Sequence, residues 1–240
     1  MDYAPPQGSP DVNVESMRKP YRSRGEAFRE VHLAAREPFA QFRDWFDDAC
    51  KTKAILEPNA MCLSTATADG RPSARFVLLK GFGRDGFRFF TNYGSRKAAE
   101  LDANPRAALT FYWEPLNRSV RVEGAVSRLP EDVSEAYFHS RPLASQIGAP
   151  LCRQSQVIAG REVLEDREAE LTRQHADGSR PVPRPDWGGY IVRPESVEFW
   201  QGQSTRVHDR IRFRRAAEDA EHGPHVHQGE DGWVYERLAP

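Results

Sequence analysis

Short runs of β-branched and aromatic residues, starting near Ala60, constrain the fold of this chain more than any other feature. Two turn pairs, Asp69-Gly70 and Asp85-Gly86, separate some of these runs, and Asp-Gly pairs favour tight hairpin turns. Regularly spaced strands with such breaks predict an antiparallel barrel or sandwich. The expected strands lie within AMCLSTAT, PSARFVLLKGF, GFRFFTN, AALTFYW, RSVRVEGAVSRL, GGYIVRPESVEFWQG, RIRFRR and GWVYERL.

Helical patterns lie around these runs, so the expected fold is mainly β with peripheral helices, an α+β class. In PFAQFRDWFDDAC, Phe39, Phe42 and Phe46 recur at helical spacing, which predicts an amphipathic helix. Ser95 is a good N-cap for a second helix in GSRKAAELDANP. A further pattern, REVLEDREAELTRQH, is highly charged and is expected to face solvent. The four helices are predicted over residues 38–50, 94–105, about 130–139 and 161–175.

The domain organisation follows from local composition. Residues 1–20 are rich in Pro, Gly, Ser and Asn and predict a disordered N-terminal arm. Residues 21–240 are expected to form one domain, with a core barrel over about 55–150. A Pro-rich linker over about 176–186 leads into a C-terminal segment, residues 187–240.

Composition excludes several classes of protein. The formal net charge of -1 argues against general nucleic-acid binding, which needs a strongly basic domain. No apolar run is long enough to span a bilayer, and the first residues lack the pattern of a signal peptide. The three cysteines form no CxxC pair, so reduced thiols in a cytoplasmic protein are expected. No metal site is expected, because His222, His225 and His227 lie in a Gly/Pro loop without a clear carboxylate or cysteine partner.

Positive charge is concentrated in WQGQSTRVHDRIRFRR, residues 200–215, which holds five arginines and a histidine. Arg206, His208 and Arg210 alternate with other residues, so a β-strand would place all three on one face. Like charges in a row repel, so an anionic partner is expected: nucleic acid, a protein carboxylate or a phosphorylated small molecule. Arginine forks match phosphate oxygens, and the histidine could do acid–base work. An exposed strand with cross-strand ion pairs explains the pattern equally well.

Two other segments carry groups that suit anions. Arg96 and Lys97 fall in the first turn of the helix predicted after Ser95, where basic residues are unfavourable unless an anion binds the helix N-terminus. On this segment alone, a pair of solvated surface charges is the favoured explanation. In SARFVLLKGF, Arg75 and Lys80 stand at the two ends of an apolar strand and could border a pocket, although surface residues flanking a core strand are commoner.

A fourth signal is the spacing of Tyr137, Arg141 and Ser145 in YFHSRPLASQ. All three can donate to a phosphate. Pro142 disfavours helical geometry at Arg141, so two helices are expected to meet there. The sequence contains no Gly-rich phosphate loop. Phosphates would therefore be bound by side chains on a β scaffold, and the separate clusters suggest more than one phosphate group.

The run VEFWQGQSTRVHDR, residues 197–210, resembles the signature of the pyridoxine/pyridoxamine 5'-phosphate oxidase family. Five further motifs resemble that family in the same order, and the match covers about residues 17–240. These motifs are SARFVLLKGF, GFRFFTNYGSRKAAEL, FYWEPLNRSVRVEG, YFHSRPLASQIGA and YERLAP. The resemblance implies an FMN-binding split β-barrel, homodimeric, with flavin in clefts between the subunits and residues 187–240 in dimerisation and the active site.

The resemblance also implies a reaction. Pyridoxine 5'-phosphate or pyridoxamine 5'-phosphate would be oxidised to pyridoxal 5'-phosphate, with O2 as acceptor, H2O2 as product and ammonia released from the amine. FMN and the substrate each carry one phosphate, which agrees with the separate anion-binding segments. Hydride transfer from the exocyclic carbon of the substrate to the flavin is expected.

Site residues follow from the resemblance position by position. The FMN set would be Arg75, Phe76, Val77, Leu78, Phe90, Thr91, Arg96, Lys97, Gln154, Ser155, Trp200 and Arg210. The substrate phosphate would be bound by Lys80, Tyr137, Arg141 and Ser145. The catalytic pair Arg206 and His208 would hold the pyridine ring against the flavin, and Arg22, Ser23, Arg24 and Gly25 would close over the substrate.

One position departs from the family pattern. Ser119 stands where the family usually has a glutamine that contacts the flavin, so weaker FMN binding is expected. Three other readings compete: a related flavin oxidase acting on phenazine precursors, a non-catalytic FMN or pyridoxal-phosphate carrier, and, more distantly, a nucleic-acid binder. The intact set for the substrate phosphate favours the phosphorylated vitamer.

Overall fold

The computed structural model describes residues 21, 27–175, 178, 180–205, 207–216 and 223–240. The predicted arm 1–20, the segment Arg22–Gly25, the catalytic candidate Arg206 and part of the predicted linker therefore lie outside the described residues.

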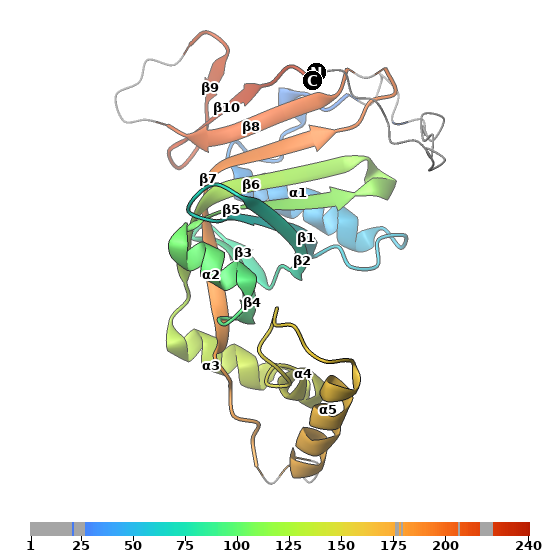
Figure 1. The fold of residues 1–240 in the computed structure, drawn as a ribbon. Coiled ribbons are helices and arrows are strands. Elements are labelled where there is room, and N and C mark those ends of the chain that lie inside the picture. Colours follow the sequence, from blue (N-terminus) through green and yellow to red (C-terminus); the bar gives the residue numbers. More distant parts are fainter. Residues whose placement is uncertain (1–20, 22–26, 176–177, 179, 206, 217–222) are drawn as a thin grey trace, which may run out of the picture.

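An antiparallel sheet of ten strands forms the body of the described chain (Figure 1). Its main path runs β2-β1-β5-β6-β7-β8-β10-β9, and β4 joins it by pairing with both β3 and β7. The mainly β fold with peripheral helices is confirmed. The strands are β1 Ala60–Ala66, β2 Pro72–Leu78, β3 Gly81–Gly83, β4 Gly86–Asn92, β5 Arg106–Trp113, β6 Arg118–Arg128, β7 Trp187–Gln201, β8 Asp209–Arg215, β9 Val226–Gln228 and β10 Trp233–Arg237.

The strand β7 determines how the sheet divides. Its first part pairs with β4 and its last part with β8, while β6 pairs along most of its length. A register shift between Glu123 and Gly124 of β6 marks the point of division. β7 consequently runs from the helices α3–α5 at one end of the molecule to the β8–β10 unit at the other (Figure 1).

The barrel closes where β2 leaves β1. The backbone N–H of Leu79 still donates to Asn59 on the β1 side, but that of Lys80 donates to Arg88 on β4. The predicted turn before β4 is present at Gly86, whose φ of +136° suits glycine. A Cβ there would also lie 2.3 Å from the carbonyl oxygen of Val192 on β7. Glycine is therefore required both for the turn and for the close approach of the two strands.

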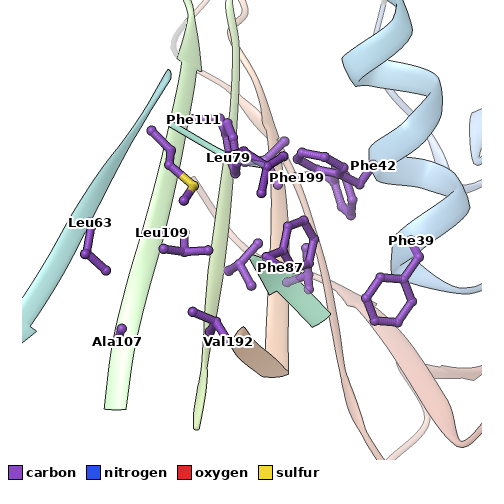
Figure 2. Packing of buried hydrophobic residues seen from close by; sticks show 14 of the residues in the cluster. Phe39, Phe42, Leu63, Leu79, Phe87, Ala107, Leu109, Phe111, Val192 and Phe199 are labelled. Carbon is purple, nitrogen blue, oxygen red and sulfur yellow. The ribbon is translucent and has the colours of Figure 1, made fainter. Parts of the chain in front are cut away.

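The helix α1, Pro38–Lys51, lies close to the predicted 38–50 and packs its buried face against the strands. The carboxylate of Glu37 caps it by accepting from the backbone N–H groups of Phe39 and Ala40. Phe42 is fully buried, and its ring lies 5.0 Å from the ring of Phe87 and 5.0 Å from that of Phe111 (Figure 2). The hydrophobic core is thus formed by the inward faces of the strands together with one face of α1.

The remaining helices are α2 Arg96–Ala103, α3 Glu131–Ser140, α4 Leu143–Gly148 and α5 Glu162–His175, with short 3-10 turns at Glu30–His32 and Glu114–Leu116. α3 ends just before Arg141 and α4 begins after Pro142, so the predicted meeting of two helices is confirmed. α5 is mostly exposed and buries only Leu171 and His175. None of the described helices is both long and apolar enough to cross a bilayer.

Two expectations from the sequence are wrong. The strand β8 begins only at Asp209, so His208 does not alternate with Arg210 on one strand face. The backbone N–H of Gln203 donates to His208 and holds the histidine in the connection before the strand. The histidine-rich loop contains the short strand β9, paired with β10, in which the ring of His227 stacks on Tyr235. His222 lies outside the described residues. Apart from these two expectations, the three cysteines are free thiols.

Candidate functional site

A cavity of about 400 Å³ lies between the β2 edge of the barrel, β4 and the helices α2–α4. It brings together twelve of the predicted site residues from four separate segments of the chain. The predicted residues in its lining are Arg75, Phe76, Val77, Leu78, Lys80, Phe90, Thr91, Lys97, Tyr137, Arg141, Ser145 and Gln154, and three further lining residues, Asn92, Pro142 and Trp187, were not predicted as site residues.

Lys97 is the buried cation of this cavity. α2 begins after Ser95, whose hydroxyl caps it by accepting from Ala98, and Lys97 lies in the first turn as predicted. Its side-chain nitrogen donates to Thr91 Oγ1 at 3.1 Å and to Gln154 Oε1 at 2.6 Å. Burial, reinforced by the charge of Arg75, lowers the pKa of Lys97 to about 8. Lys97 is therefore not the solvated surface charge that its segment alone favoured.

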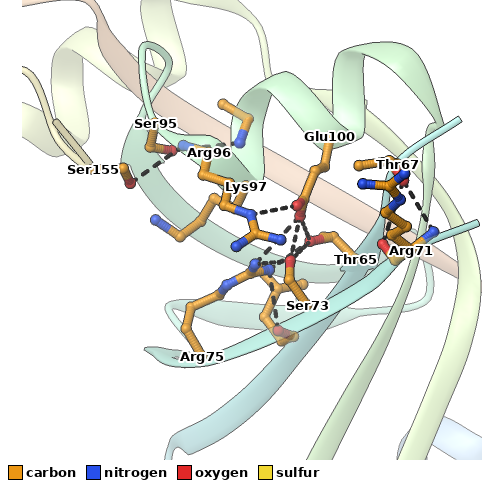
Figure 3. Close-up of polar contacts among 12 residues, drawn as sticks. Thr65, Thr67, Arg71, Ser73, Arg75, Ser95, Arg96, Lys97, Glu100 and Ser155 are labelled. Carbon is orange, nitrogen blue, oxygen red and sulfur yellow. Dashed lines mark hydrogen bonds and ion pairs between the residues drawn. The ribbon is translucent and has the colours of Figure 1, made fainter.

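Arg75 and Arg96 are joined by one carboxylate, Glu100 (Figure 3). Burial opposes ionisation of this group, but hydrogen bonds from Ser73, Thr65 and the two arginines lower the pKa of Glu100 to about 2. Glu100 was not among the residues predicted from the sequence. Its spacing of four from Arg96 was the available signal, because residues four apart share a helix face.

The loop before α5 reaches α2 at the same place. Ser155 adopts a left-handed φ of 73°, and its hydroxyl accepts from the backbone N–H of Arg96 at 3.3 Å. Ser155 and Arg96 stand beside the cavity without lining it. The first backbone N–H of α2, which a bound anion could use, is therefore already directed at a hydroxyl group.

Arg141 carries an unsatisfied donor. Its Nη1 atom is buried without a hydrogen-bond partner among the described residues. The guanidinium lies over the ring of Trp187, 4.8 Å from the ring centroid, and burial lowers the pKa of Arg141. A buried unpaired guanidinium N–H is costly unless an acceptor binds it, so this corner of the cavity suits an anion.

A second cavity, of about 380 Å³, is lined by Thr110, Tyr112, Ser119, Arg121, Glu198 and Trp200. The hydroxyl of Ser119 donates to the carbonyl of Phe111 at 2.9 Å. The ring of His208 lies 4.9 Å from that of Trp200, and Tyr21 lies against both. The Nδ1 atom of His208 accepts from the backbone N–H of Gln203 at 3.0 Å, so the neutral imidazole carries its proton on Nε2.

Arg210 is held by a carboxylate of its own chain. Its Nε atom lies 2.7 Å from Glu198 on β7, and its Nη1 donates to the carbonyl of Ala239. Further along β8, Arg212 and Arg214 pair with Glu236 on β10. Within the described part of the chain, the anionic partners of this arginine row are therefore protein carboxylates in cross-strand ion pairs.

The antiparallel barrel that divides at β7 defines the chain as a split β-barrel protein. A solved structure with this architecture is PhzG from Burkholderia lata 383, in complex with tetrahydrophenazine-1-carboxylic acid. The TM-score is 0.75 and the identity 27%, over 89% of this chain and 97% of that one.

The family follows from the sequence comparisons. Residues 46–175 match the model of pyridoxamine 5'-phosphate oxidase, and residues 187–240 match that of the pyridoxine 5'-phosphate oxidase C-terminal dimerisation region. The pyridoxine-5'-phosphate oxidase of Bos taurus is 58% identical over 231 residues, which cover 95% of this chain and 88% of the relative. The pyridoxine/pyridoxamine 5'-phosphate oxidase of Bombyx mori is 54% identical over 231 residues, 95% of this chain and 90% of the relative. The chain belongs to the pyridoxamine 5'-phosphate oxidase family.

Proposed function

We propose that this protein is an FMN-dependent oxidase that converts pyridoxine 5'-phosphate and pyridoxamine 5'-phosphate to pyridoxal 5'-phosphate, with O2 as the electron acceptor. The observation that carries the proposal is the main cavity, whose lining contains four cationic side chains. Arg75 is on β2 and Lys97 on α2, whereas Lys80 follows β2 and Arg141 lies between α3 and α4. Two phosphorylated ligands in one cavity would account for both groups.

The first group fits the phosphate of FMN. Arg75 and Lys97 line the cavity, and Arg96 stands beside it on the same helix as Lys97. A phosphate monoester carries about -1.5 to -2 charge at neutral pH and accepts strongly from such donors. When bound, FMN would supply a two-electron acceptor that O2 reoxidises. The protein's own task here is to bind and orient the flavin.

The second group fits the phosphate of the substrate. The unsatisfied Nη1 of Arg141 needs an acceptor, and Tyr137 and Ser145 add hydroxyl donors in the same cavity. The aromatic rings of Phe90, Tyr137 and Trp187 are in mutual contact on the same side. This set favours a phosphorylated substrate over an unphosphorylated phenazine precursor.

A second protomer would complete the site. Trp187 lines the main cavity and Trp200 lines the second one, yet both belong to β7, at opposite ends of a strand of 15 residues. That separation is about 40 Å along the strand, so a single ligand cannot occupy both cavities of one chain. The match of residues 187–240 to a dimerisation region supports an arrangement in which the second cavity of one protomer faces the main cavity of the other.

Arg206 and His208 would align the substrate in that composite site. The ring proton on Nε2 of His208 makes this atom a hydrogen-bond donor, while Nδ1 is occupied by Gln203. A fixed donor can hold the pyridine ring and stabilise charge that develops on it. His208 is accordingly proposed as an orienting donor rather than as an obligate general base.

The test is an oxidation assay in air. Purified protein is supplied with FMN and pyridoxine 5'-phosphate, and pyridoxal 5'-phosphate is followed by its absorbance together with O2 uptake. We expect product only when flavin is present, and far less from unphosphorylated pyridoxine. FMN binding without product or O2 uptake would contradict the oxidase and favour the carrier.

A further inference from the structure

Glu100 lies behind the cations of the main cavity rather than in its lining. The residue is on α2 and is 4% exposed, and it is absent from the residues that line the cavity. Its two oxygens nevertheless contact both arginines of the group that we propose binds the FMN phosphate.

The carboxylate accepts from four donors on three elements (Figure 3). On α2, Oε1 accepts from Arg96 Nε at 2.8 Å. Oε2 accepts from Ser73 Oγ at 2.5 Å and Arg75 Nη2 at 3.3 Å, both on β2, and from Thr65 Oγ1 on the paired strand β1. Glu100 thus ties the first turn of α2 to the edge of the barrel.

Arg75 is the side chain that this network immobilises most. Its guanidinium makes four hydrogen bonds, to Leu63 O, Thr65 Oγ1, Ser73 Oγ and Glu100 Oε2. An arginine fixed in this way loses little conformational freedom when an anion binds. The order that Glu100 imposes is therefore present before the ligand arrives.

The charges around Glu100 also match one phosphate. Arg75, Arg96 and Lys97 contribute three positive charges and Glu100 one negative charge, which leaves a net charge of two positive units. A phosphate monoester carries about -1.5 to -2 charge at neutral pH. Glu100 also favours the charged form of Lys97, against the lowering effect of burial on the pKa of that lysine.

We propose that Glu100 is a positioning residue that gives this site its selectivity for a phosphorylated flavin over riboflavin. The inference rests on the proposed function, because it assumes that the cavity binds FMN. Glu100 does not touch the ligand; it acts by holding Arg75 and Arg96 and by keeping Lys97 protonated.

Removing the charge of Glu100 has two opposite effects on FMN affinity, so the direction in which the affinity changes shows which effect is larger. Loss of a negative charge alone would strengthen the attraction for any anion. Loss of positioning would weaken it, because one amide cannot accept from two arginines and two hydroxyl groups at once. The proposal requires that the second effect is larger.

The experiment titrates apo-protein with FMN and, separately, with riboflavin, and follows flavin fluorescence. For Glu100→Gln we expect FMN to bind about tenfold more weakly or worse, while riboflavin affinity stays within about twofold of wild type. As the pH rises, the FMN affinity of this variant should also begin to fall at a lower pH than that of wild type. The matched control is Asp102→Asn, which removes another carboxylate of α2 that pairs with an arginine, Arg128, and should change neither affinity.

Ser73→Ala removes one donor to Glu100 and tests the same idea if Glu100→Gln does not fold; it should weaken FMN binding and spare riboflavin. Unchanged or tighter FMN binding in these variants would overturn the inference, as would an equal loss for both flavins, which indicates general distortion. A wild-type protein with no preference for FMN would instead overturn the proposed function.

Discussion

The side-chain nitrogen of Lys97 lies 2.6 Å from Oε1 of Gln154, a residue 57 positions further along the chain. This bond joins the first turn of α2 to the loop that precedes α5. The loop covers the lysine, and burial then lowers the pKa of Lys97 to about 8. A charge that is unfavourable in the free protein becomes favourable when an anion enters the cavity.

FMN affinity should depend on pH through the protonation of Lys97. The pKa of Lys97, lowered by burial to about 8, means that its positive charge is present below pH 8 and lost above it. FMN affinity should therefore fall as the pH rises through 8, while riboflavin affinity stays flat. Lys97→Met should bind FMN about 10- to 100-fold more weakly at pH 7 and show no fall near pH 8. A wild-type FMN affinity that is constant from pH 7 to pH 9 would be inconsistent with this role.

Lys97 should also affect stability, with a sign that can be worked out. The pKa of Lys97 is near 8 in the folded protein and near 10.5 when unfolded, so the unfolded chain binds more protons between these values. The contribution of Lys97 to the free energy of unfolding should rise with pH across that range. Lys97→Met should accordingly raise the unfolding temperature of the apo-protein at pH 7, as measured by thermal denaturation.

Arg141→Lys should not behave as a conservative change. The planar guanidinium stacks on Trp187 and directs a buried N–H that a lysine cannot replace. We expect KM for pyridoxine 5'-phosphate to rise about tenfold or more with little change in kcat, the pattern of lost ground-state binding. The control is Arg161→Lys, whose side chain is exposed and pairs with Glu165. An unchanged KM would remove Arg141 from the substrate site.

His208→Asn should lower turnover at least about tenfold, because the Nε2 donor is lost. FMN affinity should stay within about twofold of wild type, since the proposed role concerns the substrate. Arg206→Ala, at a position outside the described residues, should likewise lower turnover while FMN affinity is retained. Steady-state kinetics and flavin titration on the same preparations check both variants. Full turnover in either one would exclude it from catalysis.

Ser119→Gln should tighten FMN binding. Ser119 lines the second cavity, where its short side chain donates back to Phe111 instead of reaching outward. A glutamine, the residue that the resemblance implies for this position, would add a hydrogen bond and raise FMN affinity about two- to tenfold. Ser127→Gln, the same change near the other end of β6, should have no effect. Equal affinities of Ser119→Gln and wild type would show that the shorter side chain is neutral.

Much of the fold could be predicted from local patterns, because its signals are local. The spacing of Phe39 and Phe42 determines which face of α1 is buried, and the Asp-Gly pairs mark turns between neighbouring strands. The division of the sheet could not be predicted in this way. It depends on β7 pairing with β4, which precedes it by about a hundred residues, and neither strand carries a signal for that partner.

The site shows the same contrast. Arg75, Lys97 and Arg141 were predicted as ligand-binding residues, and they meet in one cavity. The surroundings of Lys97 were not predicted, because its burial requires the loop at Gln154. For Arg210, the sequence allowed a cross-strand ion pair, but it did not identify Glu198 as the partner. The short connection before β8 also interrupts the alternation that the sequence suggested for His208.

The central claim is that one oxidase site is formed by the main cavity of one protomer and the second cavity of another. Its most direct test is the activity of a purified heterodimer that contains Arg141→Ala in one subunit and His208→Asn in the other, each with a different affinity tag. One of the two sites then holds every wild-type residue, so at pyridoxine 5'-phosphate concentrations well below KM we predict about half of the wild-type rate of pyridoxal 5'-phosphate formation, although each parent homodimer has about a tenth of that rate or less. A heterodimer no more active than its parents would contradict a site shared between protomers.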